Sequence, residues 1–129
     1  MTRSLFVYGT LKRGAHSEGR RMLRDAEFVA RASTTGALYD LGRYPGLVRG
    51  NATRERVFGE LYRLPDDDGH RMLRQLDAYE GNEFVRRRVY VTLPNGRRRL
   101  AWAYILRRRP PQSARHVPSG RYPSRRRVA

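Results

Sequence analysis

The chain has 129 residues and 39% hydrophobic content, which is enough for one compact domain and too little for two of ordinary size. It contains no cysteine, so disulfide frameworks, thiolate nucleophiles and cysteine-based zinc sites are excluded by counting. No stretch approaches the roughly 20 consecutive apolar residues that span a bilayer, and the N-terminus lacks a cleavable signal pattern. We therefore expect a cytoplasmic protein with a single core.

The formal net charge is +16, and Lys12 is the only lysine, so arginine supplies nearly all of the positive charge. Such a surface attracts nucleic acid, acidic lipid or anionic small molecules. Arginines are nevertheless scattered through every segment, which favours a general preference for arginine over lysine. Four triplets stand apart as candidates for local anion binding: 86–88, 97–99, 107–109 and 125–127.

The first half of the chain is expected to contain strands joined by structured loops. Leu5 to Tyr8 is an apolar run that stops at Gly9, which indicates a buried strand opening into a loop. Alternating residues from Glu27 to Thr34 predict a second strand, and Ala37 to Leu41 predicts a third. The segment Gly42-Arg43-Tyr44-Pro45-Gly46 combines residues that favour turns, so a second structured loop is expected there.

The next segment predicts a strand and then a helix. Val57 to Leu64 alternates between two faces, which is typical of a half-buried strand. The acidic side chains of Asp66 to Asp68 can cap the helix that follows. Its apolar positions keep the 3.6-residue spacing of one buried face: Met72, Leu73, Leu76 and Tyr79. The helix is expected to end at Glu80, because Gly81 permits the chain to reverse.

A long antiparallel hairpin is expected after the helix. Two alternating runs, Phe84 to Leu93 and Arg99 to Leu106, flank Pro94-Asn95-Gly96, and an Asn-Gly pair in this position strongly indicates a tight hairpin turn. We expect the core face of the second strand to be the one that carries its larger apolar side chains: Leu100, Trp102, Tyr104 and Leu106.

The composition changes after Leu106. Residues 107–129 contain eight arginines and four of the seven prolines, and they contain no acidic residue. We therefore assign residues 1–106 to the domain. Residues 107–129 are expected to form an irregular tail that is partly packed on the domain or mobile.

Two segments are candidates for chemistry. Tyr8-Gly9-Thr10-Leu11 is compatible with an ordinary strand-to-loop connection, and also with a nest of backbone N–H groups that binds a carboxylate or oxyanion. Asp77 and Glu80 place two carboxylates near the end of the predicted helix, where simple solvation is one explanation. A carboxylate there meets the negative end of the helix dipole, which raises its pKa and is unusual for a purely structural group.

Together these segments resemble the γ-glutamylcyclotransferase-like family, which includes γ-glutamylamine cyclotransferases and AIG2-like proteins. The turn Tyr44-Pro45-Gly46-Leu47-Val48 and the strand Gly59-Glu60-Leu61-Tyr62 also carry the resemblance, which spans about residues 4 to 106. Pro118-Ser119-Gly120-Arg121-Tyr122 is similar to the family's terminal segment, although Arg121 stands where an aspartate is usual. The resemblance implies an α+β fold, a small mixed β-barrel with a few peripheral helices.

The resemblance also implies a reaction on a small-molecule γ-glutamyl substrate. The α-amine of the γ-glutamyl group attacks its own γ-carbonyl, which releases 5-oxoproline and an amine or amino acid. One carboxylate with a raised pKa can move the protons, and Glu80 is the catalytic candidate. Glu83 is a weaker rival outside the matching motif, and Asp77 is expected to be structural. The expected substrate-binding residues are Tyr8, Gly9, Thr10, Leu11 and Tyr44.

Other kinds of site find less support in the sequence. The three histidines have no metal-ligand spacing and the serines lack a G-x-S-x-G elbow, so we expect no metal, no cofactor and no serine nucleophile. Two alternatives stay open. One is a nucleic-acid-binding module that uses the arginine-rich surface, although we expect only nonspecific charge attraction there. The other is a pathway-specific family member that removes a γ-glutamyl protecting group. We expect no membrane contact, and the sequence leaves the oligomeric state open.

Overall fold

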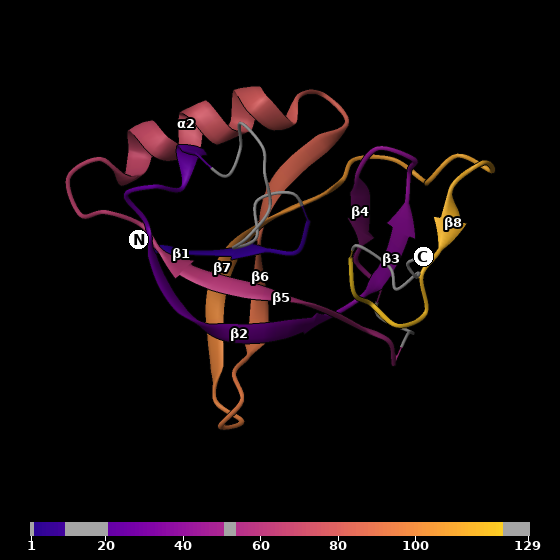
Figure 1. Ribbon diagram of the computed structural model, residues 1–129, viewed down its shortest axis with the longest axis horizontal. Coiled ribbons are helices and arrows are strands. Elements are labelled where there is room, and N and C mark those ends of the chain that lie inside the picture. The colour runs from indigo at the N-terminus through magenta and orange to yellow at the C-terminus, as the bar shows by residue number, and fades with distance from the viewer. Residues whose placement is uncertain (1, 10–20, 51–53, 123–129) are drawn as a thin grey trace, which may run out of the picture.

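The structure is a computed structural model, and it describes residues 2–9, 21–50 and 54–122. The elements in chain order are β1 (Ser4–Val7), β2 (Glu27–Thr35), β3 (Ala37–Asp40), β4 (Pro45–Val48), β5 (Arg56–Arg63), α2 (Gly69–Glu80), β6 (Phe84–Thr92), β7 (Arg98–Leu106) and β8 (Arg115–His116). Figure 1 shows the strands of a barrel with α2 lying across it and with β3, β4 and β8 to one side.

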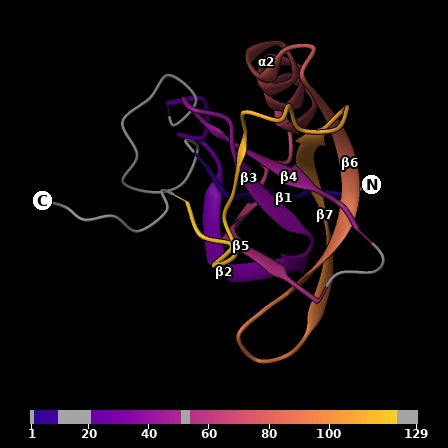
Figure 2. The ribbon, with the colours of Figure 1, turned by 90° about the vertical axis from the view of Figure 1, so that its right-hand side faces the viewer.

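Five strands close into a barrel in the order β1-β5-β2-β6-β7. Neighbouring strands pair antiparallel, except that β1 runs parallel to β7 where Leu5 faces Trp102. The hairpin of β6 and β7 turns at Pro94-Asn95-Gly96 as expected, and it projects from the end of the barrel opposite α2 (Figure 2). The expected α+β fold with a small mixed barrel is confirmed.

Three successive residues of β1, Leu5 to Val7, are apolar because both faces of the strand are buried there. Phe6 points into the barrel interior, where it joins small and branched side chains from the other strands. Leu5 and Val7 point outward and pack in a second cluster with side chains of α2. A strand that is covered on both sides reads as a continuous apolar run, and this run directs the end of β1 towards the end of α2.

Both faces of the strand β7 pack in the core: the expected core face is confirmed at Tyr104, and the opposite face forms part of a second core cluster. Ala101 and Ala103 point into the barrel interior and are fully buried. Tyr104 lies on the opposite face, in the cluster beneath α2, and Trp102 packs at the margin of that cluster. A narrow barrel has room for small side chains inside, so the large ones face the helix instead.

The helix α2 is held by its apolar face and ended by a glycine. Met72, Leu73 and Leu76 are buried against the barrel. The expected acidic cap is wrong, because the Asp68 side chain makes no capping hydrogen bond and only its carbonyl accepts the N–H of Met72, at 2.9 Å. Gly81 ends the helix with φ 76°, a conformation that favours glycine. Glu80 is therefore the last residue of the helix.

The strands β3, β4 and β8 form a separate small sheet in the order β4-β3-β8. Beyond β8, Val117 is buried, and the N–H of Phe58 in β5 donates to the carbonyl of Gly120 at 2.8 Å. The Arg121 guanidinium lies 4.0 Å from the centre of the Phe58 ring, so this arginine has a stacking partner on the barrel. Residues 115–122 thus pack on the domain, while a boundary at residue 106 stays a prediction.

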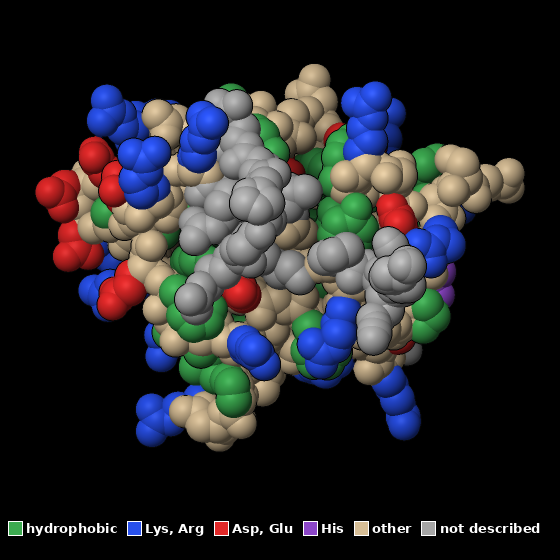
Figure 3. Space-filling model, in the orientation of Figure 1, with side chains coloured by type: hydrophobic (Ala, Val, Ile, Leu, Met, Phe, Trp, Pro, Cys, Tyr) green, Lys and Arg blue, Asp and Glu red, His purple; other side chains and the backbone are tan. Residues whose placement is uncertain are grey.

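Basic side chains are spread over the face of the molecule drawn in Figure 3 and do not gather in one patch. This distribution agrees with a general preference for arginine. One arginine of the 86–88 triplet, Arg86, is already paired with an aspartate. In the part of the chain that the structure describes, no helix has the length and apolar character needed to cross a membrane.

Candidate active site

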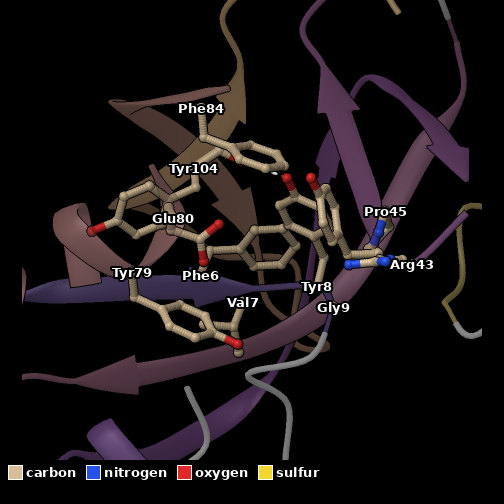
Figure 4. Close-up of a pocket in the computed structure, with 11 residues that line it drawn as sticks. Phe6, Val7, Tyr8, Gly9, Arg43, Pro45, Tyr79, Glu80, Phe84 and Tyr104 are labelled. Carbon is tan, nitrogen blue, oxygen red and sulfur yellow. Dashed lines mark hydrogen bonds between the residues drawn. The ribbon is translucent and has the colours of Figure 1, made fainter. Parts of the chain in front are cut away.

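A cavity of about 360 Å³ lies where the end of α2, the end of β1 and the turn before β4 meet. Its walls are mostly aromatic, with one carboxylate and one guanidinium among the described side chains (Figure 4). The described residues that line it are Phe6, Val7, Tyr8, Gly9, Arg43, Tyr44, Pro45, Tyr79, Glu80, Phe84 and Tyr104.

The carboxylate is that of Glu80. The side chain is half-buried and points into the cavity between Phe6 and Tyr104 (Figure 4). No described residue donates a hydrogen bond to it or forms an ion pair with it. Burial without a compensating partner raises its pKa from the ordinary value of 4.5 to about 7. Glu80 is thus able to gain and lose a proton near neutral pH.

Tyr8 and Gly9 form the described part of the expected binding loop. The hydroxyl of Tyr8 donates to the Tyr104 carbonyl at 2.5 Å and accepts from the Leu47 N–H at 3.1 Å. Tyr8 therefore offers the cavity its ring and uses its hydroxyl to tie β1 to β7 and β4. A Cβ on Gly9 would lie 2.7 Å from Cγ of Pro45, so this close approach requires glycine. Thr10 and Leu11 lie outside the described residues.

Tyr44 lines the cavity from the turn before β4. Its ring packs 5.9 Å from the ring of Phe84, between centroids. Its hydroxyl donates a short hydrogen bond to the carboxylate of Glu83, and this bond raises the pKa of Tyr44. Glu83 is exposed and is not among the described residues of the cavity wall. The structure thus brings Tyr8, Gly9 and Tyr44 to the same cavity as Glu80.

Asp77 lies one helical turn before Glu80, and its carboxylate accepts three hydrogen bonds from described residues. Its Oδ1 accepts from Nε of Arg86 at 2.8 Å and from the hydroxyl of Tyr104 at 2.6 Å, and its Oδ2 accepts from Nη2 of Arg86 at 3.1 Å. Burial alone would raise the pKa of Asp77, but the hydrogen bonds from Arg86 and Tyr104 outweigh burial and lower it. Asp77 fixes the end of α2 to β6 and β7, as a structural residue does.

The structure adds cavity residues that the sequence did not single out, among them Arg43, Phe84 and Tyr104. Arg43 precedes Tyr44 in a segment already marked as a structured turn, so its position was available as a signal. Tyr104 was assigned only to the core, and no sequence pattern connects it with Asp77. Among the described residues, no three His, Cys, Asp or Glu side chains lie together so as to hold a metal ion.

Comparisons with known proteins agree with this architecture. The model of the family described as "Gamma-glutamyl cyclotransferase, AIG2-like" matches residues 5–124. A Vibrio cholerae protein named "Putative gamma-glutamylcyclotransferase" is 38% identical over 107 residues, which cover 81% of this chain and 83% of that protein. "Gamma-glutamylcyclotransferase family protein YtfP" of Escherichia coli K12 is 35% identical over 108 residues, which cover 81% and 82%.

A solved structure extends the similarity to three dimensions. The crystal structure of an AIG2-like protein from Mus musculus matches with a TM-score of 0.67 and 26% sequence identity, over 81% of this chain and 77% of that one. The barrel, the matched residues and the identity to the bacterial relatives agree on one family. This chain belongs to the γ-glutamyl cyclotransferase, AIG2-like family.

Proposed function

We propose that the protein is a γ-glutamyl cyclotransferase that converts a γ-glutamyl amine or γ-glutamyl amino acid into 5-oxoproline and the free amine. The observation that carries this proposal is the carboxylate of Glu80, which faces the cavity without a described partner and has a pKa raised to about 7. A group that titrates near the working pH is the most effective general acid and base. Family membership supplies the type of reaction.

The reaction begins with removal of a proton from the substrate's α-ammonium by the Glu80 carboxylate. The freed amine attacks the γ-carbonyl carbon, which forms the new C–N bond of a five-membered ring and places negative charge on the carbonyl oxygen. The two reacting groups belong to one molecule, so a cavity that holds the chain folded supplies much of the rate advantage. We assign stabilisation of the oxyanion to backbone N–H groups that follow β1, in the segment from Tyr8 to Leu11.

The second stage breaks the bond between the carbonyl carbon and the departing nitrogen. The proton held by Glu80 passes to this nitrogen, which leaves as an amine. Of the three hydrogens on the original α-ammonium, one stays on the lactam nitrogen and two end on the released ammonium. Glu80 carries them one at a time and returns to the carboxylate form, so no other reactant is consumed.

The aromatic wall of the cavity supports this role for Glu80. Phe6, Tyr79 and Phe84 limit the access of water, and poor hydration is what raises the pKa of the carboxyl. The ion pair of Asp77 with Arg86 holds the end of α2 in place, so Glu80 is carried into the cavity by a rigid element. Within one helix, Glu80 thus provides the acid and base, and Asp77 holds the helix end in position.

Formation of 5-oxoproline tests the proposal directly. Purified protein is incubated with γ-glutamyl amines and γ-glutamyl amino acids, and the product is quantified by chromatography. We expect Glu80→Gln to lower kcat by about 10²- to 10⁴-fold while the circular dichroism spectrum is unchanged. Wild-type protein that forms no 5-oxoproline from any of these compounds would overturn the reaction.

Matched variants test the assignment of the residue. Glu27→Gln makes the same chemical change at an exposed residue of β2, away from the cavity, and should keep the wild-type rate. Glu83→Gln tests the neighbouring carboxylate, and a loss of rate there as large as that of Glu80→Gln would favour Glu83 as the acid and base. Full turnover by Glu80→Gln would exclude the proposed role of Glu80.

A further inference from the structure

Arg43 is the basic residue and Glu80 the acidic residue among the described side chains that line the cavity. Figure 4 shows them on opposite sides, with the rings of Phe6 and Tyr8 between them. Glu80 is half-buried, whereas Arg43 lines the cavity from an exposed position, and we call this exposed edge the mouth. A ligand that reaches across the cavity from Glu80 to the mouth therefore meets a cation at its outer end.

Two carboxylates near Arg43, those of Asp40 and Glu83, already accept hydrogen bonds from other groups. Asp40 accepts the N–H of Gly42 at 2.9 Å through Oδ1 and a hydrogen bond from Arg115 at 3.1 Å through Oδ2. Glu83 accepts the hydrogen bond of Tyr44. Arg43 forms no ion pair with any residue that the structure describes, so within that part of the chain no carboxylate competes with an anionic ligand for its guanidinium.

The backbone that carries Arg43 is held by its neighbours. The N–H of Leu41 donates to the carbonyl of Tyr44 at 2.9 Å, which closes the turn, and Pro45 directly after it is buried. The turn therefore fixes the backbone from which the Arg43 side chain extends at the edge of the cavity. A planar guanidinium binds carboxylates through paired N–H donors, with more directional specificity than an ammonium group.

We propose that Arg43 forms a subsite for a carboxylate on the leaving group, so that γ-glutamyl amino acids are preferred over uncharged γ-glutamylamines. This inference rests on the proposed function, in which the reacting γ-glutamyl head lies beside Glu80 and its oxyanion is assigned to backbone N–H groups after β1. The leaving group then extends towards the mouth. An amino acid leaving group places its carboxylate there, and an alkylamine has no charge to offer.

A matched pair of ligands isolates this carboxylate. γ-Glutamylalanine and γ-glutamylalaninamide differ only in whether the outer group is an anion or a neutral amide. Calorimetry on the Glu80→Gln protein measures their binding without turnover. We expect γ-glutamylalanine to bind about 10-fold more tightly at low ionic strength, the range of a solvent-exposed charge-assisted hydrogen bond.

Variants at Arg43 then assign the preference. Arg43→Gln, made in the Glu80→Gln protein, should reduce the preference to within about twofold, mainly by weakening the anionic ligand, and Arg43→Lys should keep part of it. Arg49→Gln removes an exposed arginine of the same region that does not line the cavity, and it should leave the preference unchanged. Equal loss for both ligands in Arg43→Gln would assign Arg43 to the γ-glutamyl head and overturn the subsite.

Turnover by the unmodified protein separates this inference from the proposed function. If the protein converts both ligands at equal kcat/KM and binds them equally, the subsite is wrong and the proposed cyclisation stands. An Arg43-dependent binding preference without 5-oxoproline from either ligand would overturn the reaction and support the subsite as an anion site. Absence of binding by both ligands would overturn the subsite.

Discussion

Asp77 and Glu80 lie one turn apart on α2, and their surroundings are opposite. Asp77 receives hydrogen bonds from Arg86 and Tyr104, which lower its pKa. Glu80 has no described partner, and burial raises its pKa to about 7. The same functional group is thus a structural anchor in one place and a candidate acid and base in the other. What decides between the roles is whether burial comes with a compensating donor.

Helix geometry explains how two neighbours reach such different surroundings. Residues three apart on an α-helix differ by about 60° in direction around the axis. Asp77 therefore faces β6 and β7, while Glu80 faces the end of β1. Tyr104 joins the two regions, because it lines the cavity and also donates its hydroxyl to Asp77. Experiments on Glu80 and experiments on Asp77 each test this contrast.

Among the further tests of this contrast, the largest effect is expected in the pH dependence of kcat/KM. Glu80 must be ionised to accept a proton, so kcat/KM should fall about 10-fold for each pH unit below its pKa of about 7. At pH 5 the rate would then be roughly 100-fold below its plateau. Initial rates of 5-oxoproline formation between pH 5 and pH 9 measure this limb. A rate that stays flat down to pH 5 would contradict a raised pKa at the catalytic group.

The next largest effect is the loss of stability expected when Asp77, the structural anchor of α2, is changed. Asp77→Asn removes the negative charge that pairs with Arg86, which should lower the free energy of unfolding by about 2 kcal/mol. The loss is smaller than for a fully buried pair because the Asp77 side chain is 41% exposed. Urea unfolding at pH 7 measures the change. Asp67→Asn, at an exposed residue before α2, is the matched control and should change stability by less than about 0.5 kcal/mol. Equal losses of stability in Asp77→Asn and Asp67→Asn would exclude a structural role for the Asp77 carboxylate.

Much of the fold follows from local patterns in the sequence. The Asn95-Gly96 pair predicted the hairpin because that turn needs its particular backbone conformations, and the spacing of Met72, Leu73 and Leu76 predicted the helix. These signals depend on residues close together in the chain. The closed barrel came from the family resemblance, since no pattern within one strand specifies the parallel pairing of β1 with β7.

The site was less accessible from the sequence. Glu80 was singled out through its motif and its place at the end of a helix, but its isolation from charge partners is a property of the fold. Asp77 was expected to be structural, but the sequence did not identify Arg86 as its partner; the fold brings the two together. On β7 the sequence indicated the face of Tyr104, which is buried, but gave no sign of the opposite face, where the barrel interior admits the small side chains of Ala101 and Ala103. Packing space, unlike periodicity, is a three-dimensional quantity.

A smaller effect should appear in the stability of Glu80→Gln. The folded pKa of about 7 exceeds the ordinary 4.5, so between these values the folded protein binds more protons than the unfolded chain, and stability falls as pH rises. Above pH 7 the ionised carboxylate costs about 1 to 2 kcal/mol, after allowance for its partial exposure. Glutamine has no such cost. The variant should therefore be more stable than wild type at pH 8 and similar to it at pH 4, as measured by urea unfolding.

A variant that is less stable at both pH values would show that the Glu80 carboxylate is favourably paired in the folded protein. Glu27→Gln is again the matched control, because that side chain is exposed and should show no such pH-dependent gain. Together with the loss of activity, a gain in stability at pH 8 would identify Glu80 as a group kept for chemistry at a cost to folding.

The smallest effect divides the anchor into its parts. Tyr104→Phe removes one hydroxyl donor to Asp77 and leaves both the ring and the Arg86 pair in place, so we expect a loss of about 0.5 to 1 kcal/mol at pH 7. A lowered carboxylate pKa gives stability that is present above the unfolded pKa, 3.8, and is lost as pH falls through the folded pKa. The difference from wild type should therefore shrink in acid. Urea unfolding at pH 7 and pH 3 tests this, and a loss as large as that of Asp77→Asn would make the phenol, rather than the guanidinium, the principal partner of the anchor.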